Sequence, residues 1–133
     1  MKLLLDTNVF LEVLLEQANA SAAVELLRNR AEHSLFLSDY ALHSIATLLI
    51  RKRQLKALQE FLADVVDAGR VRVAAVPVPD LRIVLDNAVR FNLDFADAYQ
   101  FTVADRLNLT LVSFDRDFDR TSAGRKTPGE ILA

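Results

Sequence analysis

Apolar residues occur along this chain in two patterns, short continuous runs and longer stretches with helical spacing. The short runs do not alternate with polar residues, which is typical of strands buried on both faces of a parallel sheet. They predict strands at residues 2–5, 34–37, 71–76 and 109–114. The longer stretches repeat apolar residues every three or four positions. They predict helices at residues 21–31, 39–53, 54–69, 80–91 and 94–107.

Strands and helices alternate along most of the chain, and this order predicts a three-layer α/β/α sandwich. We expect one domain over residues 1–133, with a central parallel sheet of about four or five strands and extra helix between the second and third strands. Residues 125–132 are ambiguous and could add a short edge strand. Gly69 is expected to end the helix before the third strand, and Asp80 to cap the next helix.

The composition narrows the class of protein. With 133 residues, of which 52% are hydrophobic, the chain can bury a normal core and is not disordered. It has no cysteine, so disulfides and thiolate metal sites are excluded, in agreement with a reducing cytosol. The first apolar run stops at Asp6, so we expect no signal peptide, and no run approaches the length of a membrane span. We therefore expect a cytoplasmic protein with no membrane partner.

The formal net charge of −2 excludes binding to nucleic acid by bulk charge, so any such binding needs a local basic patch. The densest basic run lies at residues 51–56. We interpret it as a solvated helix end, where cations are favourable, in preference to a track for RNA.

Several aspartates follow the ends of apolar runs. Asp6 follows the first strand, Asp115 follows the last, and Asp97 lies in the first turn of the helix between residues 94 and 107. Ligands of open parallel sheets bind at the carboxyl ends of the strands, and all three acids should lie at that edge. Asp94 and Asp117 should lie close to it.

Each of these acids alone could simply cap a helix or sit in a solvated turn, and Asp6 or Asn8 could cap the helix that follows. As a set they are harder to explain in this way, because like charges at one edge repel unless a cation compensates. Carboxylate oxygens suit Mg²⁺ or Mn²⁺. The pattern therefore predicts a divalent metal site.

Three motifs make the chain resemble the PIN domain family: "LLLDTNVF" at residues 3–10, "LDFADAYQFTVA" at 93–104 and "LTLVSFDRDF" at 109–118. Their order and spacing match over nearly the whole chain, and the two late motifs in tandem are the specific part. The family includes VapC-type toxins and RNA-processing nucleases. The resemblance implies an Mg²⁺- or Mn²⁺-dependent ribonuclease, a homodimer and, for a toxin, inhibition by a cognate antitoxin.

The resemblance also implies roles for individual residues. Asp6, Asp97 and Asp115 match the acids that bind metal and carry out catalysis in the family. Asn8 and Ser113 fall where small polar residues support the site. Asp117 is an additional acid that could act through water. Arg116 and Arg120 lie near the same edge and could contact substrate phosphates.

One position departs from the family pattern. The family usually has a glutamate in the helix after the second strand, whereas here the matching position is Ser44, with His43 beside it. Asp39, in the first turn of that helix, does not match in position. A hydroxyl is a weaker Mg²⁺ ligand than a carboxylate, so the site keeps three acids and loses one. We interpret His43 as a partly exposed helix residue and not as a ligand.

These observations predict hydrolysis of RNA phosphodiester bonds, with one divalent ion or two held by Asp6, Asp97 and Asp115. The ion would lower the pKa of a bound water and offset charge on the phosphate. Two alternatives remain open. Because of Ser44, the chain could be a degenerate PIN domain that binds RNA or a protein without cutting. A phosphatase of the aspartyl-phosphate type is less favoured, because Asn8 stands where that chemistry needs a second aspartate.

Overall fold

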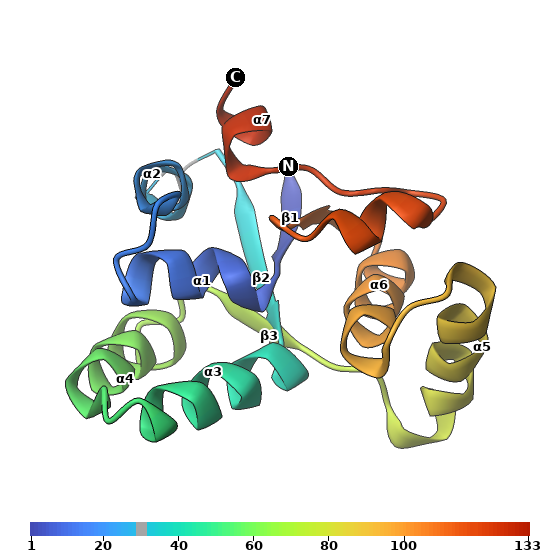
Figure 1. Ribbon diagram of the computed structural model, residues 1–133, viewed down its shortest axis with the longest axis horizontal. Helices are drawn as coiled ribbons and strands as arrows, with labels where there is room; N and C mark the ends of the chain where they lie inside the picture. Colours follow the sequence, from blue (N-terminus) through green and yellow to red (C-terminus); the bar gives the residue numbers. More distant parts are fainter. Residues whose placement is uncertain (29–31) are drawn as a thin grey trace.

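The computed structural model describes residues 1–28 and 32–133 and has a parallel sheet at its centre (Figure 1). The sheet has four strands in the order β3-β2-β1-β4. Their bounds are β1 Lys2–Leu5, β2 Ser34–Ser38, β3 Arg72–Ala74 and β4 Thr110–Val112. All three pairings are parallel, as predicted. The edge strand expected near the carboxyl end is reduced to one bridge between Val112 and Lys126.

The first strand shows why its sequence is apolar at every position. Leu3, Leu4 and Leu5 are all fully buried. Leu3 and Leu5 belong to the core on one face of the sheet, whereas Leu4 belongs to the core on the other. Successive side chains of a strand point to opposite faces, so a strand covered on both sides has no position for a polar residue. The three-layer sandwich is therefore confirmed.

Helices cover both faces of the sheet (Figure 1). One face carries α1 Thr7–Leu14, α2 Ala20–Arg28, α3 Asp39–Arg51 and α4 Leu55–Phe61. The other carries α5 Leu81–Phe91 and α6 Phe95–Leu107. A short terminal helix, α7 Pro128–Leu132, follows a capping box formed by Thr127 and Glu130. Among the described residues, no helix has the length and apolar character needed to cross a membrane.

Most of the predicted helices are present, with differences at their ends. The helix predicted at 54–69 is α-helical only to Phe61 and continues as a π-helix over Leu62–Asp67. Gly69 follows with a φ of 63°, as expected for a helix stop. The last three residues of the helix predicted at 21–31 lie outside the described residues.

Asp80 occupies the cap position of α5, but its side chain makes no capping hydrogen bond. Its carboxylate pairs instead with Arg106, 3.0 Å away. The expected cap is therefore right in position and wrong in the contact that it makes.

Helix α6, which comes between β3 and β4 in the chain, is part of the core. Its central residues, 98–104, are all buried, which explains why its apolar residues do not form a single stripe. Two polar side chains, Gln100 and Thr102, are buried among them. The first turn of α6 points to the carboxyl edge of the sheet, where β1 and β4 end side by side with Leu5 opposite Val112. This arrangement positions the candidate site.

Candidate functional site

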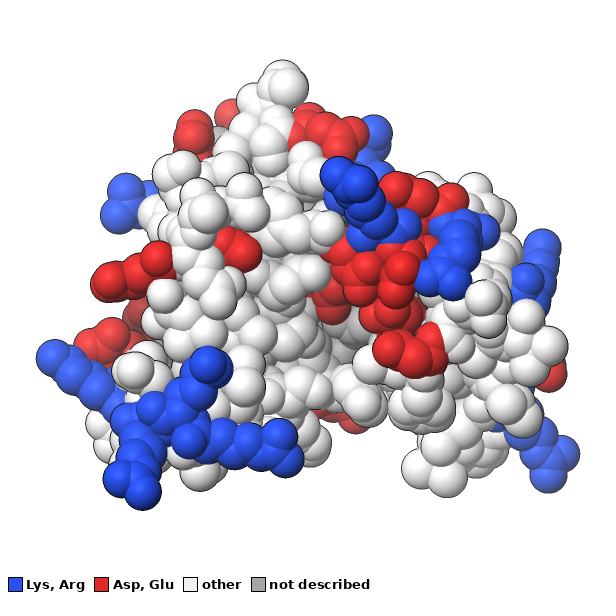
Figure 2. Space-filling model, viewed as in Figure 1, with Lys and Arg blue, Asp and Glu red and all other residues white. Residues whose placement is uncertain are grey.

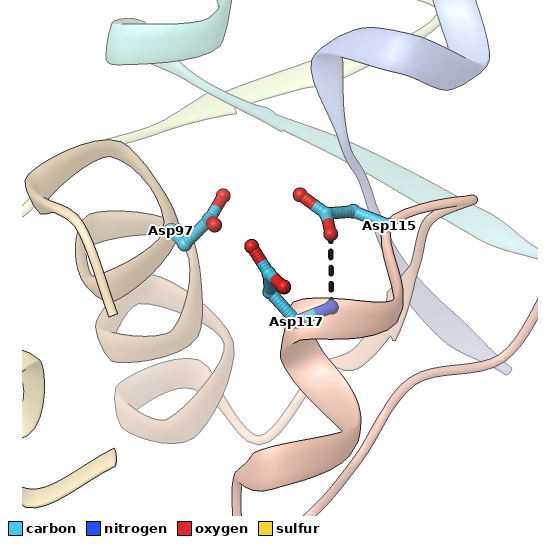
Figure 3. Close-up of side chains that lie close together, drawn as sticks. All are labelled: Asp97, Asp115 and Asp117. Atoms are coloured by element: carbon cyan, nitrogen blue, oxygen red, sulfur yellow. Dashed lines mark hydrogen bonds between the residues drawn. The ribbon is translucent and has the colours of Figure 1, made fainter. Parts of the chain in front are cut away.

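Three carboxylates meet at the carboxyl edge of the sheet (Figure 3). One oxygen from each of Asp97, Asp115 and Asp117 lies within 4.8 Å of the other two. Asp97 comes from the first turn of α6. Asp115 follows β4 and caps the 3₁₀ helix Arg116–Arg120, which contains Asp117. The Asp117 amide donates to Asp115 Oδ1 over 2.9 Å, so the second acid is oriented by the backbone of the third. Asp117, expected only as an additional acid, belongs to this central group.

Asp6 lies next to these acids but is more deeply buried, with 7% of its surface exposed. As the cap of α1 it accepts from the Thr7 amide over 2.8 Å. It also accepts from Gln100 Nε2 over 2.9 Å and from the Ser113 hydroxyl over 2.7 Å. Burial raises the pKa of Asp6 despite these hydrogen bonds, and Asp115 adds to the rise. Asp6 and Asp97 line the same pocket, of about 310 Å³.

Asn8 and Ser113 connect the ends of β1 and β4 beneath the acids. The Ser113 hydroxyl accepts from Asn8 Nδ2 over 3.2 Å and from the Asp115 amide over 2.9 Å while donating to Asp6. Asn8 Oδ1 accepts from the Phe114 amide over 3.3 Å. Both residues thus lie where they were expected, and they orient Asp6 and Asp115.

Gln100 contributes to this site and was not predicted from the sequence. Only 2% of its surface is exposed, and its Oε1 atom is buried without a hydrogen-bond partner among the residues that the structure describes. An unpaired buried amide oxygen is costly, so it marks a place where a further donor or cation fits. The signal that could have found it is its spacing: Gln100 is three residues after Asp97 and therefore on the same helix face.

Ser44 lies in the same pocket as Asp6 and Asp97, as its place in the sequence predicted. His43 beside it is exposed, as expected. Asp39 does not reach the acids. Its Oδ1 accepts from the Tyr99 hydroxyl over 2.7 Å, and that hydroxyl accepts from the amide of Val76.

The two arginines expected to meet phosphates differ in their contacts. Arg120 is held beside the acids, with one guanidinium nitrogen 2.6 Å from Asp117 Oδ1 and another donating to the Asn92 carbonyl over 2.7 Å. Part of its charge therefore compensates Asp117. Arg116 is exposed at the same edge.

Crowding of the acids has a clear electrostatic result. The pKa of Asp97 is raised from 3.8 to about 7 by burial first, and then by the charges of Asp94, Asp115, Asp6 and Asp117. A divalent cation among these groups would remove the repulsion. The donors are all hard oxygens, and Gln100, whose buried Oε1 atom has no hydrogen-bond partner among the described residues, also lines the pocket of Asp6 and Asp97. The residues therefore fit Mg²⁺ or Mn²⁺.

The raised pKa of Asp97 predicts how stability depends on pH when no metal is bound. The pKa of the Asp97 carboxyl is 3.8 in the unfolded chain and about 7 in the folded protein. The folded state therefore holds an extra proton between these pH values. Stability should therefore fall as pH rises from about 4 to about 7. Urea unfolding in a chelator should show a higher midpoint at pH 5 than at pH 8, and Mn²⁺ should raise the midpoint mainly at pH 8. Equal midpoints at both pH values in the chelator would contradict this.

Comparisons with known proteins add to this geometry. The sequence model of the PIN domain matches residues 3–124. No curated protein matches the chain. Among solved structures, VapC20 of Mycobacterium tuberculosis, a sarcin-ricin loop cleaving toxin, has a TM-score of 0.74 at 22% identity, covering 92% of this chain and 95% of that chain.

Two further structures are similar. VapBC2 of Rickettsia felis, bound to a DNA fragment from its promoter, has a TM-score of 0.71 at 15% identity and covers 95% of this chain and 97% of that one. FitAcB of Neisseria gonorrhoeae has a TM-score of 0.67 at 24% identity and covers 96% of this chain and 98% of that one. At these identities the likeness establishes a shared fold.

Proposed function

Because this chain belongs to the PIN domain family, we propose that it is a divalent-metal-dependent ribonuclease that hydrolyses RNA phosphodiester bonds as the toxin of a toxin–antitoxin pair. The observation that carries the proposal is the convergence of Asp97, Asp115 and Asp117 beside the buried Asp6. Acids that only cap helices have no reason to bring their oxygens within 4.8 Å of one another. PIN domains generally bind divalent metals, and this donor set suits one.

The roles of the residues follow from their contacts. Asp97, Asp115 and Asp117 would hold the ion, and Asp6 would complete the site from its buried position. When bound, Mg²⁺ or Mn²⁺ makes a water molecule more acidic and offsets negative charge on the phosphate. Ser113 and Gln100 fix the Asp6 carboxylate from opposite oxygens, Ser113 at Oδ2 and Gln100 at Oδ1. This limits the movement of Asp6 when the ion enters or leaves.

RNA is proposed as the substrate because of the family and because the solved structure of VapC20 is described as a sarcin-ricin loop cleaving toxin. A cognate antitoxin is proposed on the same basis, since similar structures include toxin–antitoxin complexes.

We also propose a homodimer in the cytoplasm. Large apolar side chains on α5, Ile83, Leu85 and Val89, are between 42% and 77% exposed and would be covered in a dimer. Light scattering at micromolar concentration should then give twice the chain mass.

The central test is cleavage of a labelled single-stranded RNA in Mn²⁺. The same reaction with a chelator in place of Mn²⁺ is the negative control. We expect cleavage by the wild type and its loss in Asp115→Asn. The matched control is Asp119→Asn, which removes an exposed acid from the same 3₁₀ helix, where it pairs with the largely buried side chain of Arg125. Equal cleavage by both variants would point to a contaminating nuclease. RNA binding without cleavage in Mn²⁺ would instead favour the degenerate binding module.

A further inference from the structure

A groove runs along α3 and extends away from the acids. Its lining residues on the helix are Tyr40, His43, Ser44, Thr47, Leu48 and Arg51, and Thr7 of α1 completes it. Their spacings of three and four residues place them on one helix face. We call this feature, of about 630 Å³, the α3 groove. From Tyr40 to Arg51 it follows twelve residues of helix. The eleven steps between them span about 16 Å at 1.5 Å per residue.

The α3 groove is continuous with the pocket of the acids. Thr7, Tyr40 and Ser44 line both the groove and the pocket that contains Asp6 and Asp97. A chain whose phosphate lies at the acids could therefore extend along α3 without leaving the surface.

Aromatic side chains stand where the groove meets the acidic pocket. Tyr40 is 37% exposed and Phe95 is 49% exposed, and their ring centroids are 5.9 Å apart. Tyr99 packs below Tyr40 at 5.6 Å and is anchored through its hydroxyl to Asp39. An exposed ring held in place from below is the kind of surface on which an unstacked base can lie.

The other end of the groove is basic. Arg51 lines it, and Lys52, Arg53 and Lys56 follow directly, all exposed. Figure 2 shows basic side chains gathered where α3 meets α4, away from the acids at the carboxyl edge of the sheet. The sequence alone favours a solvated helix end for residues 51–56, but their place at the end of the groove gives them a second role. In a chain with a net charge of −2, they supply the local basic patch that binding to a polyanion requires.

We infer that the α3 groove binds a single-stranded segment of RNA beside the cleaved bond, with a base on Tyr40 and Phe95 and a phosphate at Arg51. This inference rests on the proposed function and adds how the substrate is held. The hydroxyls of Ser44 and Thr47 and the ring of His43 offer hydrogen bonds between the two ends. A duplex does not satisfy the groove, because its bases are stacked on one another and cannot lie on a protein ring.

The test measures RNA affinity separately from cleavage. Fluorescence anisotropy is recorded in Mn²⁺ with a short unstructured RNA and with a blunt-ended duplex, on an Asp115→Asn background chosen to prevent cutting. Tyr40→Leu should weaken binding of the unstructured RNA about tenfold, and Tyr40→Phe should restore it, because the ring is kept. Arg51→Ala should lower the slope of log affinity against log salt by about 0.7, the value for one phosphate on a single strand.

Arg82→Ala is the matched control, because it removes an exposed arginine from α5 and should change neither quantity. Thermal unfolding of each variant checks that the fold is kept. Unchanged affinity in Tyr40→Leu and Arg51→Ala, with wild-type cleavage intact, overturns the inference and leaves the proposed function standing. Tighter binding of the blunt-ended duplex than of the unstructured RNA also overturns it. A change of oligomeric mass in these variants at unchanged affinity overturns it as well, because it would make the groove a subunit interface. Absence of both binding and cleavage in the wild type overturns both proposals.

Discussion

Replacing Asp97 with asparagine should abolish metal-dependent cleavage and, at the same time, stabilise the metal-free protein at neutral pH. The first effect follows because Asp97 is the only member of the carboxylate trio that comes from α6, so its loss opens one side of the site. Loss of residues that merely orient metal ligands reduces affinity or activity 10–100-fold, so loss of a ligand should cost at least about a hundredfold. The second effect follows because the substitution removes a carboxylate that four other acids repel.

The stabilisation should be modest, no more than about 1 kcal/mol, because Asp97 is partly exposed and solvent screens its charge. It should disappear below about pH 3, where the wild-type carboxyl is protonated in both states. Calorimetry with Mn²⁺ and urea unfolding in a chelator measure the two effects on the same samples. Asp94→Asn is the matched control for Mn²⁺ binding: Asp94 caps α6 by accepting from the Asp97 amide over 2.8 Å, and asparagine caps equally well. Its effect on stability in the chelator measures the share of the repulsion on Asp97 that comes from Asp94. Equal Mn²⁺ binding by wild type and Asp97→Asn would remove Asp97 from the site.

The sequence predicted the sheet well because burial on both faces leaves a strong pattern. Leu3, Leu4 and Leu5 must all be apolar, whatever the details of packing, so the strand can be recognised locally. The order of strands and helices then forces Asp6, Asp97 and Asp115 to one edge. That edge is a property of topology, and topology is what alternating elements determine.

The burial of each acid and its individual contacts could not be predicted in this way. The sequence ranked Asp6 with Asp97 and Asp115, whereas the structure buries Asp6 and puts Asp117 in the closest group of oxygens. The difference arises because the 3₁₀ helix after Asp115 brings its second residue, Asp117, back to the same space. Short turns of this kind have no periodic signal.

Gln100 shows a second limit of sequence reasoning. In a helix that is buried nearly all round, a glutamine looks like a chance polar residue, since no stripe marks a functional face. Its role becomes visible only in the structure. There the Gln100 amide nitrogen donates to Asp6, and the amide oxygen has no partner among the described residues. The same holds for Arg120, whose contact with Asp117 depends on the path of the loop.

Substituting Ser44 with glutamate should tighten Mn²⁺ binding at least tenfold and raise Mn²⁺-dependent cleavage of single-stranded RNA. Ser44 lines the pocket of Asp6 and Asp97 from α3, opposite the acids of the other two segments, so a longer acidic side chain there extends toward the same space. A further hard anionic ligand strengthens a one-ion site and can help to hold a second ion. Tenfold corresponds to about 1.4 kcal/mol, a modest gain for a partly buried carboxylate facing a cation.

The substitution should also reveal the crowding of the site when metal is absent. A fifth acid near Asp97 adds repulsion, so Ser44→Glu should be less stable than the wild type in a chelator and should regain stability in Mn²⁺. His43→Glu is the matched control for Mn²⁺ binding and stability, because it adds the same charge one residue earlier at an exposed position that does not line the acidic pocket. Its cleavage is not compared, since His43 lines the α3 groove. If Ser44→Glu is destabilised equally with and without Mn²⁺ and gains no activity, Ser44 is only a packed helix residue. If wild-type cleavage is robust, lost in Asp6→Asn and unchanged in Ser44→Glu, then the acids already present suffice for catalysis.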